Sequence, residues 1–350
     1  MKNSVLKNKI ILITGGTGSF GYAAVKRLLE QDLKEIRIFS RDGVKQSKMA
    51  FHFQKHRDSS VLHFFNGDIT DSKSLDKAMK GVDLLVHAAA VKEVPYCEAN
   101  PLEAARINIF GTGNVIDCAV SNNVGKIIII STDKACYPVG AMGISKAMME
   151  KVAFSAAEKT GVTRSPDKES ITSVCIVRFG NLLGSAGTVV PIFVKQIKEG
   201  KHLTVTNPEM TRFMMTPDDA VDLTFCAILE GRNGDLIIQE APSATLETLT
   251  KALVDLYGSG RRSEIEVLGP RPGEKLFETM ATQSEMFKAT DIPFISESTD
   301  SGPGKKYLRI PLNGSFVNPE AMEFNSHSSP VDKEHMKSIL IYLKFVAEKH

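Results

Sequence analysis

The fold is decided near the start of the chain, where the sequence reads IILITGGTGSFG from Ile10 to Gly21. Residues 10–14 form a continuous apolar run, as expected of a strand buried on both faces, and residues 19–31 have the spacing of a helix. The glycines between them permit a tight turn and let the backbone approach a pyrophosphate at the positive end of the helix. The stretch therefore predicts a dinucleotide-binding site. Its expected contacts are Gly15, Thr17, Gly18, Ser19, Phe20 and Gly21.

The first half of the chain repeats this alternation of buried strand and amphipathic helix, which is typical of a parallel sheet with helices on both faces. Further strands are expected at residues 35–40, 61–66, 83–87, 127–131, 173–178 and 236–239. Helices are expected from Pro101 toward Ser121 and from Thr216 to about Gly231. We therefore predict an α/β fold of the Rossmann type, a doubly wound parallel sheet with a smaller mixed α/β domain for the substrate.

The division of the chain into parts follows from where this alternation stops. The cofactor domain is expected to comprise residues 1–180 and about 232–241, and the substrate domain residues 181–231 and 242–290. The pattern becomes irregular after about Asn181, which is why the boundary is placed there.

Residues 291–350 are expected to form a carboxy-terminal extension. Its Ser-, Gly- and Pro-rich stretch at residues 296–304 predicts a mobile surface loop. A final amphipathic helix begins near Asp332, and its apolar stripe is expected to pack onto the body of the protein or onto a second subunit. The stripe consists of Met336, Ile339, Leu340, Leu343 and Val346.

The composition is that of an ordinary globular protein, with 42% hydrophobic and 24% charged residues. A net charge of +2 gives no electrostatic case for nucleic acid or an acidic membrane. The apolar runs are too short for a membrane span, and the first residues lack the pattern of a signal peptide. The 5 cysteines are scattered without a CxxC pair, which indicates free thiols in a reducing compartment. We expect a cytoplasmic protein without a bound metal.

The end of the second predicted strand distinguishes between the two nicotinamide cofactors. An NAD-selective site would place an acidic residue there for the ribose 2′-hydroxyl, but the chain has Ser40 and Arg41, which suit a 2′-phosphate. We therefore expect NADP. Asp42, the next residue, counts against this choice, and a solvated surface charge is the alternative for Arg41.

Other residues at strand ends complete the expected cofactor site. Asp68 is placed at the adenine edge, with a turn cap as an equal alternative, and His87 is either a packed histidine or a contact. Small side chains after the fourth strand leave room for the ribose and phosphates. The additional cofactor contacts are Asp68, Ile69, Ala88, Ala89 and Ala90.

The reacting centre is expected where the fifth strand runs into Thr132, Asp133 and Lys134. Side chains at the carboxyl end of a parallel strand face the ligand crevice, and the helix that follows carries Met142 and Lys146 there. An acid beside an amine is explained either by a surface ion pair or by catalysis, and in this crevice we favour catalysis.

This arrangement resembles the extended short-chain dehydrogenase/reductase family, whose fingerprint combines Gly-x-x-Gly-x-x-Gly with Tyr-x-x-x-Lys. Here Met142 occupies the tyrosine position and only Lys146 of the pair remains. A thioether cannot take a hydroxyl proton, so the usual general base is missing. The resemblance implies that Lys146 holds the nicotinamide ribose. Tyr137 is a candidate to replace the missing base, although a packed tyrosine is the favoured interpretation.

Six motifs make the resemblance narrower: TGGTGSFG (14–21), FSRD (39–42), AAAVKEVP (88–95), STDKA (131–135), RFGN (178–181) and MTRF (210–213). They are similar to those of the inverting UDP-N-acetylglucosamine 4,6-dehydratases, in the branch that carries methionine at the position of Met142 and serves capsular polysaccharide. The match covers most of residues 8–290. A polar insertion at residues 160–170 and the stretch at residues 294–307 depart from it.

The acid–amine pair suits such a dehydration. Oxidation of the sugar at C4 acidifies the C5 hydrogen, a base removes it, an acid protonates the departing C6 hydroxyl, and the hydride returns to C6. NADP is then tightly bound and recycled. We expect Lys134 to be the base, with a pKa lowered by burial near the cationic Lys146, and Asp133 to be the acid, although the two roles can be exchanged. Inversion at C5 is implied by the resemblance alone.

The substrate is expected to be a UDP-N-acetylhexosamine. The resemblance places Lys92, just past the fourth strand, near the reacting sugar, and the other contacts come from basic and polar residues of the second half of the chain. A solvated charge is the alternative for each of them taken singly. The expected contacts are Lys92, Asn181, Arg212, Arg271 and Glu274.

Two other functions fit the residues less well. A UDP-N-acetylhexosamine 4-epimerase would use the same oxidation but needs no C5 base, so Asp133 and Lys134 argue against it. A catalytically silent NADP-binding protein would explain Met142 but not the acid–amine pair. The resemblance also implies that the protein forms a homo-oligomer, and a hexamer is one of the assemblies it allows.

Overall fold

The computed structural model describes residues 4–56, 58–162, 172–185, 188–258, 264–295 and 305–348. The loop expected at residues 296–304 and most of the polar insertion at residues 160–170 lie outside the described residues.

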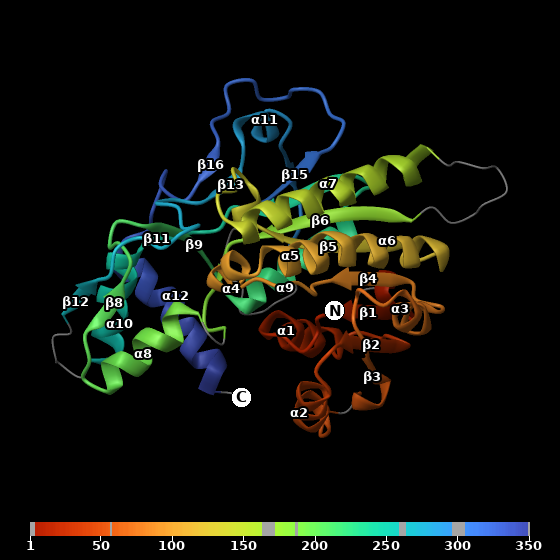
Figure 1. The fold of residues 1–350 in the computed structure, drawn as a ribbon, viewed down its shortest axis with the longest axis horizontal. Helices are drawn as coiled ribbons and strands as arrows, with labels where there is room; N and C mark the ends of the chain where they lie inside the picture. Colours follow the sequence, from red (N-terminus) through yellow and green to blue (C-terminus); the bar gives the residue numbers. More distant parts are fainter. Residues whose placement is uncertain are drawn as a thin grey trace.

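One large sheet forms the centre of the molecule. Within the described residues it has nine strands, in the order β14-β15-β10-β6-β5-β4-β1-β2-β3 (Figure 1). Those from β10 to β3 run parallel, which confirms the predicted doubly wound α/β fold. The bounds are β1 (Ile10–Thr14), β2 (Glu35–Ser40), β3 (Leu62–Asn66), β4 (Leu84–His87), β5 (Lys126–Thr132), β6 (Ser173–Phe179), β10 (Asp235–Gln239), β14 (Thr290–Ile292) and β15 (Tyr307–Pro311).

Helices cover both faces of this sheet, which is why its central strands are continuous apolar runs. On one face α1 (Ser19–Leu28) packs against α9 (Pro217–Glu230), while α3 (Ser72–Met79), α6 (Thr112–Ser121) and α7 (Ala141–Val162) pack together on the other (Figure 1). Helix α2 (Gly43–Phe53) lies beside β2 and β3. Thr216 begins α9 with a capping box, in which its side chain and that of Asp219 each accept a backbone N–H of the other residue.

The helix expected from Pro101 toward Ser121 is interrupted. It consists of α5 (Pro101–Ala105), a π-helical segment (Arg106–Gly111) and α6. The π-helical segment carries Asn108, whose fully buried amide donates to the backbone carbonyl of Val91 at 2.9 Å and accepts from its N–H at 2.8 Å. Asn108 also donates to Ser145 Oγ on α7 at 2.9 Å. The interruption therefore ties the chain after β4 to the helix that carries Met142 and Lys146.

A second group of elements lies beside the central sheet and has an apolar cluster of its own. Its strands are β7 (Asn181–Leu182), β9 (Thr211–Met215) and β11 (Ser243–Thr245) in one sheet, and β8 (Leu203–Val205) and β12 (Ile265–Val267) in another. Its helices are α8 (Val189–Lys198) and α10 (Leu246–Tyr257). The final helix α12 (Lys333–Glu348) packs on α10, and Met336 and Leu340 of its predicted stripe are buried in the cluster. This part of the stripe therefore packs against the body of the protein.

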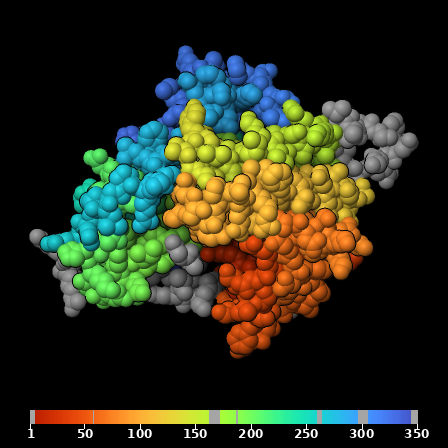
Figure 2. All heavy atoms as spheres, viewed as in Figure 1, coloured from red at the N-terminus to blue at the C-terminus, as the bar shows by residue number. Residues whose placement is uncertain are grey.

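The carboxy-terminal extension adds structure that the sequence did not predict. Strand β15 pairs antiparallel with β10 at the sheet edge, and β14 pairs antiparallel with β15. Strand β16 (Phe324–Asn325) pairs with β13 (Thr279–Ala281), which the short helix α11 (Gln283–Met286) follows in the chain. The short helix α4 (Val94–Ala99) packs against α7. Figure 2 shows these cyan and blue segments covering one end of the molecule above α7. None of the described helices is both long and apolar enough to cross a membrane.

Candidate active site

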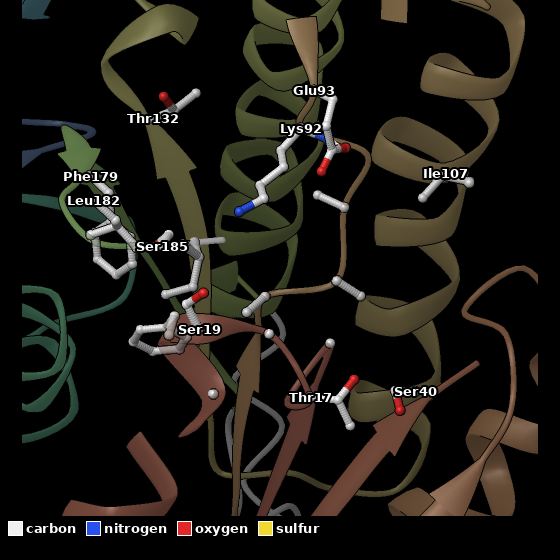
Figure 3. Close-up of a pocket in the computed structure, with 18 of the residues that line it drawn as sticks. Thr17, Ser19, Ser40, Lys92, Glu93, Ile107, Thr132, Phe179, Leu182 and Ser185 are labelled. Atoms are coloured by element: carbon white, nitrogen blue, oxygen red, sulfur yellow. Dashed lines mark hydrogen bonds between the residues drawn. The ribbon is translucent and has the colours of Figure 1, made fainter. Parts of the chain in front are cut away.

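A cavity of about 490 Å³ opens at the carboxyl ends of β1, β2, β4, β5 and β6, where the predicted cofactor and reacting residues meet (Figure 3). The predicted residues that line it are Gly15, Thr17, Gly18, Ser19, Phe20, Gly21, Ser40, Arg41, Asp68, Ile69, Ala88, Ala89, Ala90, Lys92, Thr132, Lys134, Met142, Lys146 and Asn181. The predicted residues outside this lining are Asp133, Arg212, Arg271 and Glu274.

The glycine-rich turn fits a pyrophosphate for reasons visible in its backbone. Gly15 has a φ of +67°, and a Cβ there would lie 2.7 Å from the backbone of Ala89. A Cβ on Gly21 would lie 1.8 Å from the carbonyl oxygen of Gly16, so only glycine lets α1 pack this close. Gly18 is the N-cap of α1 and offers no side-chain cap, which leaves the first-turn N–H groups available to an anion.

The ribose end of the cavity is bounded by Arg41 and Lys45. Arg41 Nη1 lies 3.6 Å from Asp68 Oδ2, so it is paired, although its side chain is still 55% exposed. Asp42, which counted against NADP in the sequence, is the N-cap of α2, and its Oδ1 accepts the backbone N–H of Lys45 at 3.0 Å. Ser40 Oγ accepts from Gln46 Nε2 at 3.0 Å. The cations at this end are therefore suited to a phosphate, and Asp42 is occupied as the N-cap of α2.

Asp68 combines the two roles that the sequence left open, a residue of the cofactor cavity and a turn cap. Its Oδ1 accepts the backbone N–H and the hydroxyl of Thr70, each at 2.8 Å, so it closes a turn, and it also lines the cavity. Burial raises the pKa of this carboxyl, but the bonds from Thr70 and the charge of Arg41 outweigh it and leave the pKa below its usual value.

His87 is a packed histidine rather than a ligand contact. It is 1% exposed, and its ring nitrogens lie 2.7 Å from Thr14 Oγ1 and 2.9 Å from Thr112 Oγ1. Burial, together with the charge of Lys146, lowers its pKa to about 3, so the imidazole is neutral at physiological pH. It joins β1, β4 and α6 beneath the cavity floor.

Met142 and Lys146 lie side by side on α7 at the cavity wall. The Lys146 ammonium donates to the carbonyl oxygen of Ile130 at 2.7 Å and lies 3.2 Å from Met149 Sδ. Burial lowers its pKa to about 8, against the opposing charge of Glu150. Tyr137 does not replace the missing tyrosine here, because it is 53% exposed in a left-handed conformation and is outside the cavity lining, and it is not packed either.

Lys134 is the centre of a charged cluster. Its Nζ donates to Asp133 Oδ1 at 2.9 Å and to Asn181 Oδ1 at 3.2 Å, and it lies 3.5 Å from Glu278 Oε1. The prediction of a lowered pKa for Lys134 is wrong in direction. Burial does lower the pKa, but the carboxylates of Asp133 and Glu278 raise it further. The lysine with the lowered pKa is Lys146, whose ammonium contacts the Ile130 carbonyl oxygen and Met149 Sδ.

Asp133 lies behind Lys134 rather than in the cavity. It is fully buried, its Oδ1 also accepts the Thr132 hydroxyl at 2.9 Å, and its Oδ2 has no hydrogen-bond partner among the described residues. Burial raises its pKa despite the charge of Lys134. Because Asp133 is outside the cavity lining, it can reach a ligand only through Lys134 or by moving.

The remaining predicted substrate residues lie beside the cavity. Arg212 lies on β9 with 9% of its surface exposed, and its guanidinium donates to the carbonyl oxygen of Thr211 at 2.8 Å. Its charge lowers the pKa of Lys134. Arg271 and Glu274 close a surface turn, in which the Arg271 N–H donates to Glu274 Oε2 at 3.2 Å. The backbone of Gly273, in this turn, packs against Gly140, which lies just before α7.

Sequence reasoning missed Glu278 and Lys275, which complete the cluster around Lys134. Lys275 Nζ lies 2.8 Å from Glu278 Oε2 and donates to the carbonyl oxygen of Cys136 at 3.0 Å. The only sequence signal was an i,i+3 pair of opposite charges, which by itself predicts a surface ion pair. Among the described residues, no group of three or more His, Cys, Asp or Glu is arranged to hold a metal ion.

Comparison with known proteins agrees with this geometry. Residues 11–299 match the family described as polysaccharide biosynthesis protein. Proteins named UDP-glucose 4-epimerase from Rickettsia massiliae and Rickettsia felis are 42% and 41% identical to this chain, each over 98% of both chains.

Solved structures show the same architecture. The X-ray structure of Pen from Bacillus thuringiensis superposes with a TM-score of 0.85 at 32% identity, covering 96% of this chain and 99% of that one. A dTDP-glucose 4,6-dehydratase from Streptomyces venezuelae, solved with NAD bound, has a TM-score of 0.66 at 23% identity over 76% of this chain and 86% of that one. At that identity the second likeness concerns the fold alone.

Proposed function

Because this chain belongs to the polysaccharide biosynthesis protein family, we propose that it catalyses the NADP-dependent 4,6-dehydration of UDP-N-acetylglucosamine, with inversion at C5. The product would be a UDP-4-keto-6-deoxy-N-acetylhexosamine for a surface polysaccharide. The observation that carries the proposal is the Asp133–Lys134 pair at the end of β5, with the Lys134 amine at the cavity wall and Met142 in place of a tyrosine. A simple redox or epimerase site has no need of such a pair.

The residues around the cavity suit NADP. NADP bound there would supply reversible hydride transfer, from C4 of the sugar and back to C6. We assign the pyrophosphate to the turn of Gly15–Gly21, the 2′-phosphate to Ser40 and Arg41, and the nicotinamide ribose to Lys146.

The two proton transfers can share one hydrogen bond. A proton that moves from Lys134 to Asp133 across 2.9 Å turns the ion pair into a neutral amine and a neutral acid without a change in net charge. Lys134 in that form accepts the C5 proton. Because Asp133 lies outside the cavity lining, its proton would reach the departing C6 hydroxyl through Lys134, which restores the ion pair. The raised pKa of the buried Asp133 favours the neutral pair, whereas the raised pKa of Lys134 opposes it.

We assign the sugar to the cavity beside Lys92 and Asn181, since the side chain of Lys92 extends across it (Figure 3). The diphosphate and uridine would then run toward Arg212 and the turn of Arg271–Glu274. This assignment keeps the division into a cofactor domain of residues 1–180 and about 232–241, and a nucleotide-sugar domain of residues 181–231 and 242–290.

The experiment that tests the proposal uses the purified protein with UDP-N-acetylglucosamine in heavy water, without added reductant. We expect a product that has lost one water, with a new methyl signal and deuterium at C5, and the C5 coupling constants then report inversion. No turnover of any nucleotide sugar by a protein that carries NADP would contradict the proposal and favour a silent NADP-binding protein.

The second candidate is a UDP-sugar 4-epimerase, which the names of the Rickettsia relatives favour. The same incubation separates the two, because an epimerase would give the C4 epimer with no loss of water and no deuterium at C5. UDP-glucose in a parallel reaction tests the substrate that those names state.

A further inference from the structure

Glu278 is a second buried carboxylate, besides Asp133, that lies close to the Lys134 amine. Its side chain is 3% exposed, and its Oε1 lies 3.5 Å from Lys134 Nζ. Asp133 Oδ1 lies 2.9 Å from the same nitrogen. Lys134 is therefore held between two carboxylates, one adjacent in the chain and one from the segment just before β13. A buried carboxylate is costly unless it is paired, so packing alone does not explain why Glu278 is buried beside Lys134.

The fold fixes Glu278 through its backbone. Its N–H donates to Ser326 Oγ at 2.9 Å, and its carbonyl oxygen accepts the N–H of Ser326 at 2.8 Å. Ser326 in turn lies 2.8 Å from Thr211 Oγ1, next to Arg212. The carbonyl oxygen of Met280 accepts from Arg178 at 2.9 Å, which ties β13 to β6. The extension and the central sheet thus jointly aim this carboxylate at Lys134.

Lys134 is surrounded by charged side chains from several different elements of the fold. Asp133 and Glu278 raise its pKa, and Arg212 lowers it. Burial raises the pKa of Glu278, but Lys134, Lys275 and Arg212 outweigh it and keep the carboxylate ionised. Of the two acids, Glu278 is thus the one that stays charged, while burial favours a proton on Asp133.

We propose that Glu278 is a positioning residue for Lys134, and that its carboxylate provides the fixed counter-charge when this amine takes a proton from the substrate. The inference rests on the proposed function. In the step concerned, the C5–H bond breaks, an N–H bond forms on Lys134, and the electron pair left on C5 is delocalised into the C4 carbonyl. The new ammonium then lies against a carboxylate that was ionised beforehand.

The first test compares wild type, Glu278→Gln and Glu278→Asp by kcat as a function of pH. The neutral glutamine weakens Lys134 as a base, so the rise of kcat with pH should move about one unit or more to lower pH, and the plateau should fall. Aspartate keeps the charge, and its rise should stay near that of wild type. Glu285→Gln is the matched control, because it removes a carboxylate that is paired with Arg178 rather than with Lys134, and its rise should not move.

A second readout needs no turnover. The NADP-loaded protein without substrate is treated with acetic anhydride across a range of pH, and acetylation of Lys134 is followed by peptide mass spectrometry. Acetylation requires the neutral amine, so in Glu278→Gln its onset should move in the same direction as the kcat rise.

The outcomes separate the two proposals. A shift in both readouts for Gln, with neither in Asp or the Glu285 control, supports the inference. Loss of activity in Glu278→Gln with unmoved pH dependence and unmoved acetylation overturns it and leaves Glu278 a structural residue. A shifted acetylation in a protein whose wild type does not dehydrate the sugar supports the charge pairing and overturns the proposed function instead.

Discussion

Under the proposed function, Arg41 is the residue on which the choice of cofactor would depend. Its guanidinium lines the cavity and, within the described residues, pairs only with Asp68 at 3.6 Å, so it can turn toward a 2′-phosphate. We expect Arg41→Ala to weaken NADP binding by about tenfold or more, since a hydrogen bond to a charged group is worth about 1.5–3 kcal/mol. NAD binding should change little.

Isothermal titration with both cofactors measures this effect. Lys48→Ala is a suitable control, because Lys48 lies on α2, shortly after Arg41 in the chain, but outside the cavity lining. Equal weakening for NADP and NAD would remove Arg41 as the basis of cofactor choice.

Under the proposed function, Lys134 is the residue on which the dehydration would depend. Lys134→Gln keeps a polar side chain of similar length but cannot accept a proton, so we expect the rate of deuterium incorporation at C5 to fall at least about 100-fold. NADP should still be bound, and reduced cofactor should still form on addition of the sugar. The exposed Lys151→Gln on α7 is the control. Retention of wild-type exchange by Lys134→Gln would assign the C5 base elsewhere.

At the scale of elements, the π-helical segment between α5 and α6 carries the clearest consequence. The buried Asn108 amide makes three hydrogen bonds, two to the backbone of Val91 and one to Ser145. Asn108→Leu leaves those buried groups unpaired, and we expect the free energy of unfolding to fall by about 3 kcal/mol.

Urea unfolding measures that loss, and a kinetic assay should show a raised KM, because Val91 precedes Lys92 and Ser145 precedes Lys146. The partly exposed Asn122 on the C-terminal end of α6 is the comparison, with an expected loss of about 1 kcal/mol or less for Asn122→Ala. Similar losses for the two variants would mean that the interruption of the helix has no special structural role.

At the scale of the whole molecule, His87 couples stability to pH. Its pKa is lowered from the ordinary 6.5 to about 3 by burial, so between these values the unfolded chain binds a proton that the folded protein does not. The stability that neutral His87 contributes is complete above pH 6.5 and is lost as the pH falls toward 3. Between pH 7 and pH 4 we expect this residue to account for about 3 kcal/mol.

Urea unfolding of wild type and His87→Gln at a series of pH values tests this. Glutamine can still bond both Thr14 and Thr112, so its stability should depend less steeply on pH over this range, while other groups act equally in both proteins. Parallel curves would show that His87 does not titrate differently in the folded and unfolded states.

Sequence patterns identified the parallel sheet and the cavity wall because both depend on neighbours in the chain. A strand buried on two faces is a run of apolar residues, and a glycine turn between strand and helix has a fixed spacing. The structure of Ile10–Gly21 can therefore be predicted from that stretch of sequence alone. The carboxyl ends of parallel strands share one edge of the sheet, which is why Ser40, Ala88 and Lys134 could be placed together in advance.

Only the tertiary structure decided what lies across from those residues. The sign of the Lys134 pKa shift depends on Glu278, which belongs to a distant segment aimed by Ser326 of the extension, and no local pattern announces that pairing. The same holds for β15, which is short and finds its partner β10 only at a sheet edge already formed. Short-range periodicity determines which elements form, whereas charge interactions act through space, so their balance at a site exists only once the chain has folded.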